Sequence, residues 1–113
     1  MSHDTVALPP GTLVDTLRID RVLGAGAFGI TYLVTDTLPG TPFALKEYLP
    51  RDQGRRLPDR RLQPLDAAEG SFKAGLEHFL AEGRSVARLT QRNIVKVHRC
   101  FEANGTAYML MPW

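Results

Sequence analysis

The 113-residue sequence has one cysteine, no long apolar run and little excess charge of either sign. Cys100 alone cannot form a disulfide within the chain, and residues 1–12 lack the basic start and apolar core of a secretory signal, so we expect a reducing compartment. No stretch approaches the ~18 consecutive apolar residues of a membrane-spanning helix. We therefore expect a cytoplasmic location, with any membrane anchor lying outside these residues.

The sequence also has little net charge and few histidines. The formal net charge of +2 is too small to favour nucleic acid or an anionic membrane as a partner. The three histidines, His3, His78 and His98, lack the spacing of metal ligands, so no metal site is predicted in these residues. A content of 43% hydrophobic and 23% charged residues is typical of one small folded domain.

The first half of the chain alternates strand-forming segments with turns. Residues 1–12 carry Pro9, Pro10 and Gly11 and are expected to form a flexible leader before the folded part, residues 13–113. Segments 13–23, 30–35 and 42–48 are rich in β-branched, aromatic and aliphatic residues. Each is predicted to be a strand, so this half is predicted to be a β-meander.

Residues 50–71 form a long stretch rich in proline, glycine and charge. Its length exceeds that of usual loops in compact domains, so we expect an exposed insertion with room for a short helical turn. Its arginines either dock a partner or belong to a solvated loop, and the solvated loop is favoured. They are Arg51, Arg55, Arg56, Arg60 and Arg61.

From Phe72 onward, apolar residues recur at helical spacing. The stripe consists of Phe72, Leu76, Phe79, Leu80, Gly83 and Ala87. It predicts one amphipathic helix of roughly 18 residues with Ser71 as its N-cap. Residues 94–102 and 107–111 are then predicted to be two strands joined by an Asn104-Gly105 hairpin turn.

The turn Gly24-Ala25-Gly26-Ala27-Phe28-Gly29 contains a G-x-G-x-x-G pattern, which is weak alone. The dinucleotide-binding version requires a helix directly after the glycines, whereas the residues that follow favour a strand. A P-loop is excluded because no Gly-Lys-Ser/Thr closes the turn. A strand–turn–strand hairpin fits another mechanism, in which a backbone without Cβ atoms lies over the phosphates of ATP and Phe28 shields them. The alternative is a merely tight hairpin.

Two charged residues are expected beside this turn. Lys46 follows the apolar run Phe43-Ala44-Leu45 and matches the lysine of the kinase strand motif V-A-I-K, whose cationic arm reaches the α- and β-phosphates. The alternative is an ordinary surface lysine. A lysine in such a cleft needs a counter-charge, and at ~100° per residue Glu82 lies at the edge of the apolar stripe. Glu82 is preferred because Glu69 precedes the periodic segment and Glu77 lies on its polar side.

Taken together, these motifs resemble the bacterial eukaryotic-like serine/threonine protein kinases. Gly24-x-Gly26-x-x-Gly29, Ala44-x-Lys46, Glu82 and Asn93-Ile94-Val95 stand in kinase order at kinase-like intervals. The resemblance spans roughly residues 16–113. It implies an α+β fold, the ATP-binding N-terminal lobe of a kinase, with a five-stranded antiparallel sheet and one main helix.

The resemblance also implies a set of nucleotide contacts. Leu23, Thr31 and Ala44 would cover the adenine, Met111 stands at the gatekeeper position, and Pro112-Trp113 would begin the hinge. The full implied set is Leu23, Gly24, Ala25, Gly26, Ala27, Phe28, Gly29, Thr31, Ala44, Lys46 and Met111. The sequence departs from the family where Thr31 replaces valine, where Gln91-Arg92 replaces His-Pro, and where Pro112 lacks a hinge N–H.

The family's H-R-D, D-F-G and A-P-E motifs would lie after Trp113, and they supply the catalytic Asp and the Mg²⁺ ligands. The leading hypothesis is therefore the ATP lobe of a serine/threonine kinase, inactive by itself, in a coding frame that continues past Trp113. Its expected partners are ATP, its own C-terminal lobe and, in the complete kinase, Mg²⁺ and a protein substrate. The alternative is a stand-alone, non-catalytic kinase-like lobe that acts as a regulatory or protein-binding module.

Overall fold

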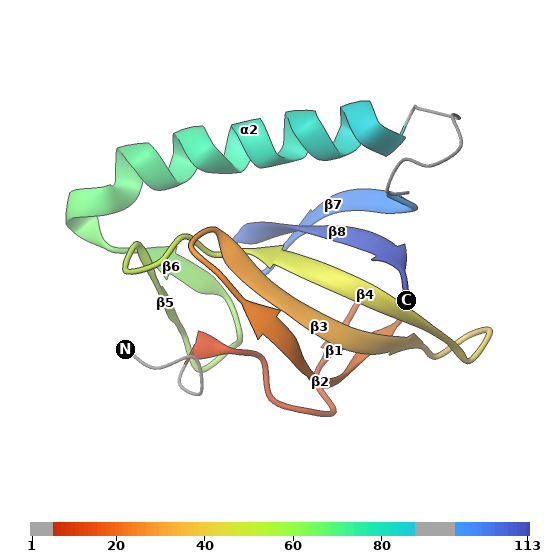
Figure 1. Cartoon of the computed structure of the whole chain (residues 1–113). Coiled ribbons are helices and arrows are strands. Elements are labelled where there is room, and N and C mark those ends of the chain that lie inside the picture. Colours follow the sequence, from red (N-terminus) through yellow and green to blue (C-terminus); the bar gives the residue numbers. More distant parts are fainter. Residues whose placement is uncertain (1–5, 88–96) are drawn as a thin grey trace.

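The computed structural model describes residues 6–87 and 97–113, and its main feature is a six-stranded antiparallel sheet with a long helix beside it (Figure 1). The strand order across the sheet is β1-β2-β3-β4-β8-β7. The strands are β1 (Leu13–Val14), β2 (Leu17–Ala25), β3 (Gly29–Asp36), β4 (Thr41–Tyr48), β7 (Arg99–Ala103) and β8 (Thr106–Pro112). The predicted α+β architecture is confirmed. The predicted strand 13–23 is divided by a turn, so the short β1 adds one strand to the five expected.

The sheet curls until its two outer strands approach one another. Asp15, between β1 and β2, accepts a 2.8 Å hydrogen bond at Oδ2 from Nη2 of Arg99 at the start of β7, although β1 and β7 are opposite edges. The ion pair is exposed, so it adds only ~1 kcal/mol or less to stability. The curl encloses the larger apolar core, which includes Leu17, Tyr32 and Leu45.

Strand alternation divides β4 between two environments. Leu45 and Glu47 point to the larger core, and both are fully buried. Tyr48 points to the opposite face, where it packs in a second core against Phe72 and Phe79 of the helix. Lys46 shares this second face with Tyr48.

Part of the 50–71 segment is folded onto the sheet, and the expectation of an exposed insertion is wrong there. β5 (Gly54–Arg56) pairs with β6 (Leu62–Pro64) in a separate two-stranded sheet. Leu62 is 4% exposed, and its N–H donates to the carbonyl oxygen of Asn104 at 2.7 Å. The Arg56 side chain is 6% exposed in an ion pair with Glu47. An apolar anchor and a buried charge pair thus dock this hairpin, while Arg51, Arg55, Arg60 and Arg61 remain exposed.

The leader is also anchored within its described residues. Val6 and Leu8 belong to the larger core at 8% and 2% exposure, and the Leu8 N–H donates to the Tyr32 hydroxyl at 3.0 Å. Residues 9–12 are more exposed. The leader therefore packs against the sheet from Val6 onward instead of hanging free.

Helix α2 (Glu69–Ala87) follows a 3₁₀ turn, η1 (Asp66–Ala68), and is 19 residues long. The predicted apolar stripe is confirmed at Phe72, Phe79 and Leu80, which are all buried. Ser71 is not the N-cap, because η1 and Glu69 extend the helical backbone ahead of it and its hydroxyl donates to the carbonyl oxygen of Ala68 at 3.1 Å. No helix in the described residues is long and apolar enough to cross a membrane.

The predicted hairpin at Asn104-Gly105 is confirmed. Both residues have positive φ, 53° and 69°, which is the conformation of a two-residue type I′ turn. It joins β7 to β8 with Ala103 opposite Thr106. The predicted strand began at Ile94, but residues 94–96, like Gln91 and Arg92, lie outside the described part of the chain.

Candidate functional site

One face of the central strands carries four of the residues expected to bind a nucleotide: Thr31, Ala44, Lys46 and Met111. The register sets Thr31 of β3 opposite Lys46 of β4, and Lys46 opposite Met109 of β8. Ala44 is opposite Met111 in the same way. Because residues two apart share a face, β3, β4 and β8 place these side chains on one face of the sheet, in two neighbouring rows.

The glycine-rich turn caps the end of the β2–β3 hairpin. The Gly26 N–H donates to the Gly29 carbonyl oxygen at 2.9 Å, and Phe28 at the tip is 70% exposed. A Cβ atom on Gly24 or Gly26 would meet no atom within 4 Å, and neither residue has positive φ. Nothing in the described chain requires glycine at these two positions, which leaves room for a ligand to approach the backbone.

Gly29 has a different role. A Cβ atom there would overlap the carbonyl oxygen of Glu47 on the neighbouring strand. The carbonyl oxygens of Phe28 and Ala27 accept hydrogen bonds from the N–H groups of Leu49 (3.0 Å) and Arg51 (2.9 Å). The turn is therefore fixed to the chain that leaves β4.

A cavity of about 610 Å³ lies between this turn, the β4–β8 surface and helix α2. Phe28, Lys46 and Glu82 line it from three different elements, and Met111 lines it from β8. The other lining residues are Tyr48, Pro50, Gln53, Ser71, Gly75, His78, Phe79, Val97 and Met109. Of the predicted contacts, Leu23, Gly24, Ala25, Gly26, Ala27, Gly29, Thr31 and Ala44 do not line this cavity. Gly26 lines a smaller cavity of about 260 Å³ instead. Ala27 belongs to the turn, and the others belong to strands β2, β3 and β4.

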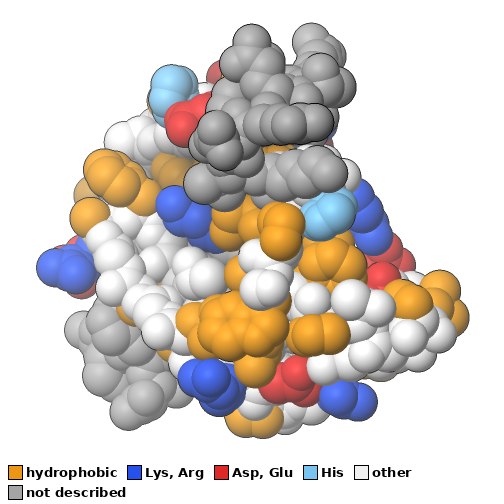
Figure 2. All heavy atoms as spheres, turned by 45° about the vertical axis from the view of Figure 1, so that its right-hand side comes forward, with side chains coloured by type: hydrophobic (Ala, Val, Ile, Leu, Met, Phe, Trp, Pro, Cys, Tyr) orange, Lys and Arg blue, Asp and Glu red, His pale blue; other side chains and the backbone are white. Residues whose placement is uncertain are grey.

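The surface at the C-terminal end of β8 is partly apolar. Hydrophobic side chains gather on this face among scattered charged ones (Figure 2), and Trp113 is 63% exposed. Such a surface suits contact with an apolar group more than with a fully solvated polar one.

Lys46 and Glu82 line one cavity without forming an ion pair. The carboxylate of Glu82 instead lies 3.4 Å from Nε2 of His78, one helical turn away, and both side chains are largely exposed. Within residues 6–87 and 97–113, Lys46 takes part in no ion pair. An exposed contact at i,i+4 is worth only ~0.5 kcal/mol, so it presents little barrier to a turn of Glu82 toward Lys46. The Lys46–Glu82 pair stays a prediction.

Several solved structures have a similar fold. PpkA, solved as PpkA-294 in its apo form, is 33% identical and superposes with a TM-score of 0.88 over 95% of this chain and 38% of its own. The kinase domain of PknI from Mycobacterium tuberculosis is 27% identical with a TM-score of 0.64, over 95% of this chain and 36% of its own. A double-mutant form of that domain gives 25% identity and a TM-score of 0.67. The chain has the fold of a protein-kinase N-terminal lobe. No protein-family model and no curated protein sequence matches it.

This kinase lobe spans just over a third of the length of the kinase structures it matches. Its α2 takes the place of the single large helix that the resemblance implies, and its β2–β3 hairpin carries the glycine-rich turn. Among the described residues of the lobe, no group of three or more histidine, cysteine or acidic side chains could hold a metal ion.

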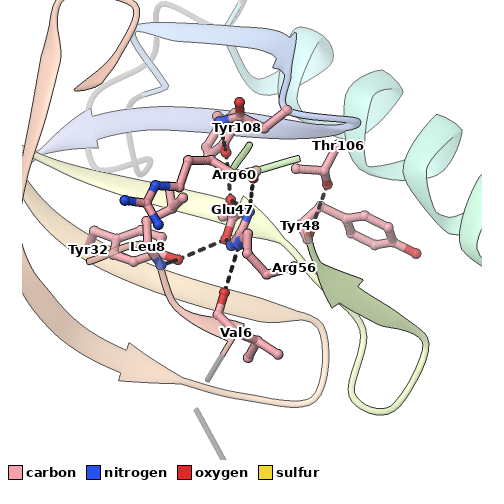
Figure 3. Close-up of polar contacts among 10 residues, drawn as sticks. Val6, Leu8, Tyr32, Glu47, Tyr48, Arg56, Arg60, Thr106 and Tyr108 are labelled. Atoms are coloured by element: carbon pink, nitrogen blue, oxygen red, sulfur yellow. Dashed lines mark hydrogen bonds and ion pairs between the residues drawn. The ribbon is translucent and has the colours of Figure 1, made fainter. Parts of the chain in front are cut away.

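A buried polar network that the sequence did not predict lies on the opposite face of β4 (Figure 3). Glu47 is fully buried, and Arg56 binds both of its carboxylate oxygens, at 2.6 Å through Nη2 and 3.1 Å through Nη1. The Tyr32 hydroxyl donates to Oε1 at 2.8 Å, and the Tyr108 hydroxyl donates to Oε2 at 2.5 Å. Every oxygen of this buried carboxylate therefore has at least two donors.

The network has clear electrostatic consequences. Burial, followed by the charge of Glu47, raises the pKa of Tyr32 and of Tyr108 far above its usual range, so both hydroxyls remain donors. Burial opposes the charge of Arg56, but the hydrogen bonds and charge of Glu47 outweigh it and raise the pKa of the guanidinium. Removing one partner of such a buried pair lowers the free energy of unfolding by ~3–5 kcal/mol, because the other charge is left buried without a counter-charge.

A sequence signal for part of this network exists. In a strand, adjacent residues face opposite sides, so a Lys46 that faces the cleft places Glu47 toward the far core. A carboxylate among the apolar residues of that core requires a cation. The sequence offered several arginines in the insertion and did not show which one docks.

Proposed function

We propose that this lobe binds ATP between its glycine-rich turn and α2, as the nucleotide-binding lobe of a serine/threonine protein kinase. In the complete protein it would position the phosphates for transfer to a protein serine or threonine. One observation carries the proposal: Phe28 of the turn, Lys46 of β4 and Glu82 of α2 line the same 610 Å³ cavity. Kinase domains with the same lobe fold support it.

Each element would have its own task. The turn backbone at Gly24 and Gly26 has open space around it and would lie close to the phosphates. The Gly26 N–H is bound to the Gly29 carbonyl oxygen, so other N–H groups of the turn would be directed to the phosphates. Lys46 would neutralise part of the charge on the α- and β-phosphates, and Glu82 would turn from His78 to fix the lysine. Phe28 would limit the access of water.

The adenine would occupy the surface next to β8. Leu23, Thr31 and Ala44 would cover it, and Met111 would limit the depth of the pocket from its position opposite Ala44. Pro112 has no N–H to offer, so a hydrogen bond to the adenine edge would come from other backbone atoms.

Catalysis itself would need groups that the motifs of this lobe do not include. Phosphoryl transfer in kinases uses an Asp that accepts the hydroxyl proton and acidic or amide ligands for Mg²⁺. We therefore assign this lobe nucleotide binding and phosphate positioning, and no proton transfer or metal coordination. By itself it should not transfer phosphate.

The test is an equilibrium titration of the 113-residue chain with a fluorescent ATP analogue. Lys46→Met should weaken binding about tenfold or more, because a charge-assisted contact to phosphate is lost. Lys73→Met, at an exposed position on α2, is the matched control and should bind as the parent does. Glu82→Gln should weaken binding more than Glu77→Gln, which alters an exposed residue away from the cavity. Equal affinities for the Lys46 and Lys73 variants would refute the assignment of Lys46.

A further inference from the structure

The ion pair between Glu47 and Arg56 joins the two ends of a short segment, residues 47–56. Backbone N–H groups within this segment form hydrogen bonds to the glycine-rich turn. Glu47 follows Lys46 and is the last residue but one of β4, and Arg56 ends β5. Between them, the Leu49 and Arg51 N–H groups donate to the carbonyl oxygens of Phe28 and Ala27. The pair therefore closes a loop that carries the anchors of the turn.

Arg56 also fastens the leader and its own hairpin. Its Nε donates to the Val6 carbonyl oxygen at 2.9 Å, and Nη1 donates to the Arg60 carbonyl oxygen at 2.9 Å (Figure 3). Together with the two bonds to Glu47, the guanidinium thus joins the leader, β4 and the β5–β6 hairpin. The planar fork of arginine allows this geometry, and a lysine ammonium at the same place would not reproduce it.

Among residues 6–87 and 97–113, the nearby exposed arginines have no such contacts. Arg55 is the neighbour of Arg56, and within this part of the chain its guanidinium bonds only to the side chain of Gln63 in the same hairpin, at 2.7 and 3.0 Å. Arg61 pairs with Asp59 two residues away, and both are exposed. Of the insertion arginines, Arg56 is therefore the one joined to β4.

We propose that Arg56 is a positioning residue of the nucleotide site, which acts through Glu47 and the 47–56 segment on the glycine-rich turn and on the direction of Lys46. The inference rests on the proposed function. A fixed Glu47 sets the rotation of β4, and with it the direction in which Lys46 leaves the opposite face. The closed segment keeps Leu49 and Arg51 within hydrogen-bond distance of the turn.

The experiment compares Arg56→Lys and Arg56→Met with Arg55→Met, which removes an arginine one residue away without touching Glu47. Amide hydrogen exchange is followed at Leu49 and Arg51, with Val34 and Leu110 of the central sheet, outside the Glu47 network, as internal references. Affinity for the fluorescent ATP analogue is measured below the unfolding transition of each variant. Because Arg56→Met leaves Glu47 without its cation and can unfold the lobe, Arg56→Lys keeps the proposal testable.

Arg56→Lys should speed exchange at Leu49 and Arg51 about tenfold and weaken nucleotide binding by a similar factor, while the reference amides change little. The Arg55 variant should match the parent in both measurements. Exchange that rises equally at all four amides, or unchanged affinity in a folded Arg56→Lys protein, would mean that the pair only stabilises the fold and would overturn the proposal. A parent chain that binds no nucleotide would refute the proposed function instead, and the exchange pattern alone would then decide whether Arg56 positions the turn.

Discussion

Glycine stands at three positions of the β2–β3 turn for different physical reasons. At Gly29 the neighbouring β4 backbone occupies the space of a side chain, since a Cβ atom would overlap the Glu47 carbonyl oxygen. At Gly24 and Gly26 the space is open and φ is ordinary. The first requirement comes from the fold and the other two from the ligand that we propose.

Gly26→Ala and Gly29→Ala should therefore have separate effects. Gly29→Ala should lower the free energy of unfolding by ~1–3 kcal/mol, because a backbone carbonyl cannot move aside as a flexible side chain can. Gly26→Ala should leave the melting temperature nearly unchanged and weaken binding of an ATP analogue. Thermal unfolding and titration of both variants check this, and a Gly26 variant that binds as tightly as the parent would contradict the role of the turn.

The position of a single residue could be predicted from the sequence only where a local pattern determines it. Lys46 was predicted beside the glycine-rich turn from its match to the V-A-I-K motif, and the register sets it opposite Thr31 and Met109. Ser71 was predicted to cap the helix because serine often does, yet the preceding 3₁₀ turn continues the helical backbone past it. A cap depends on where the chain before it goes, which a local pattern does not contain.

At the scale of elements, helix α2 lies unusually close to the sheet at two glycines. A Cβ atom on Gly75 would overlap the Tyr48 hydroxyl, and one on Gly83 would lie 2.6 Å from the sulfur of Cys100. The Tyr48 hydroxyl donates to the Phe72 carbonyl oxygen at 3.3 Å, so the same contact ties strand to helix. These small residues let α2 pack closely against β4 and β7, and they fix how far Glu82 lies from Lys46.

Gly75→Ala and Gly70→Ala test this packing as a matched pair within one helix. Alanine is favoured over glycine in a helix by ~1 kcal/mol, so Gly70→Ala, where a Cβ atom meets nothing within 4 Å, should raise stability. Gly75→Ala should lower it by ~1–3 kcal/mol despite that gain, because Tyr48 must move. Chemical denaturation of both variants measures the change in the free energy of unfolding, and stabilisation by Gly75→Ala would contradict the close packing.

Elements with a strong pattern of their own were predicted well. The amphipathic stripe gave α2, and the Asn104-Gly105 dipeptide gave the β7–β8 turn. The β5–β6 hairpin was missed because its anchors are tertiary contacts that no local pattern shows: Leu62 bonds to Asn104, and Arg56 to Glu47. Proline, glycine and charge indicate a loop locally, and only the tertiary contacts reveal that part of it is buried.

At the scale of the whole molecule, the two faces of the curled sheet differ in role: one stabilises the fold, and the other carries the candidate site. One face, filled by the leader, the insertion hairpin and the Glu47 network, holds the lobe together. The other carries Lys46 and the cavity beneath α2. The sequence predicted the second face through motifs with a chemical purpose, and it left the first unpredicted because burial of a charge pair depends on the complete fold.

Mapping a bound nucleotide by nuclear magnetic resonance tests the central claim most directly. A non-hydrolysable ATP analogue is added to the ¹⁵N-labelled chain, and amide shifts are followed. We predict the largest changes at Phe28 in the turn, at Lys46 and at Met111, which line the same cavity. Changes confined to Gly26, Asp52, Gly54 and Leu65, which line a smaller cavity of about 260 Å³, or no changes at all, would contradict ATP binding beneath α2.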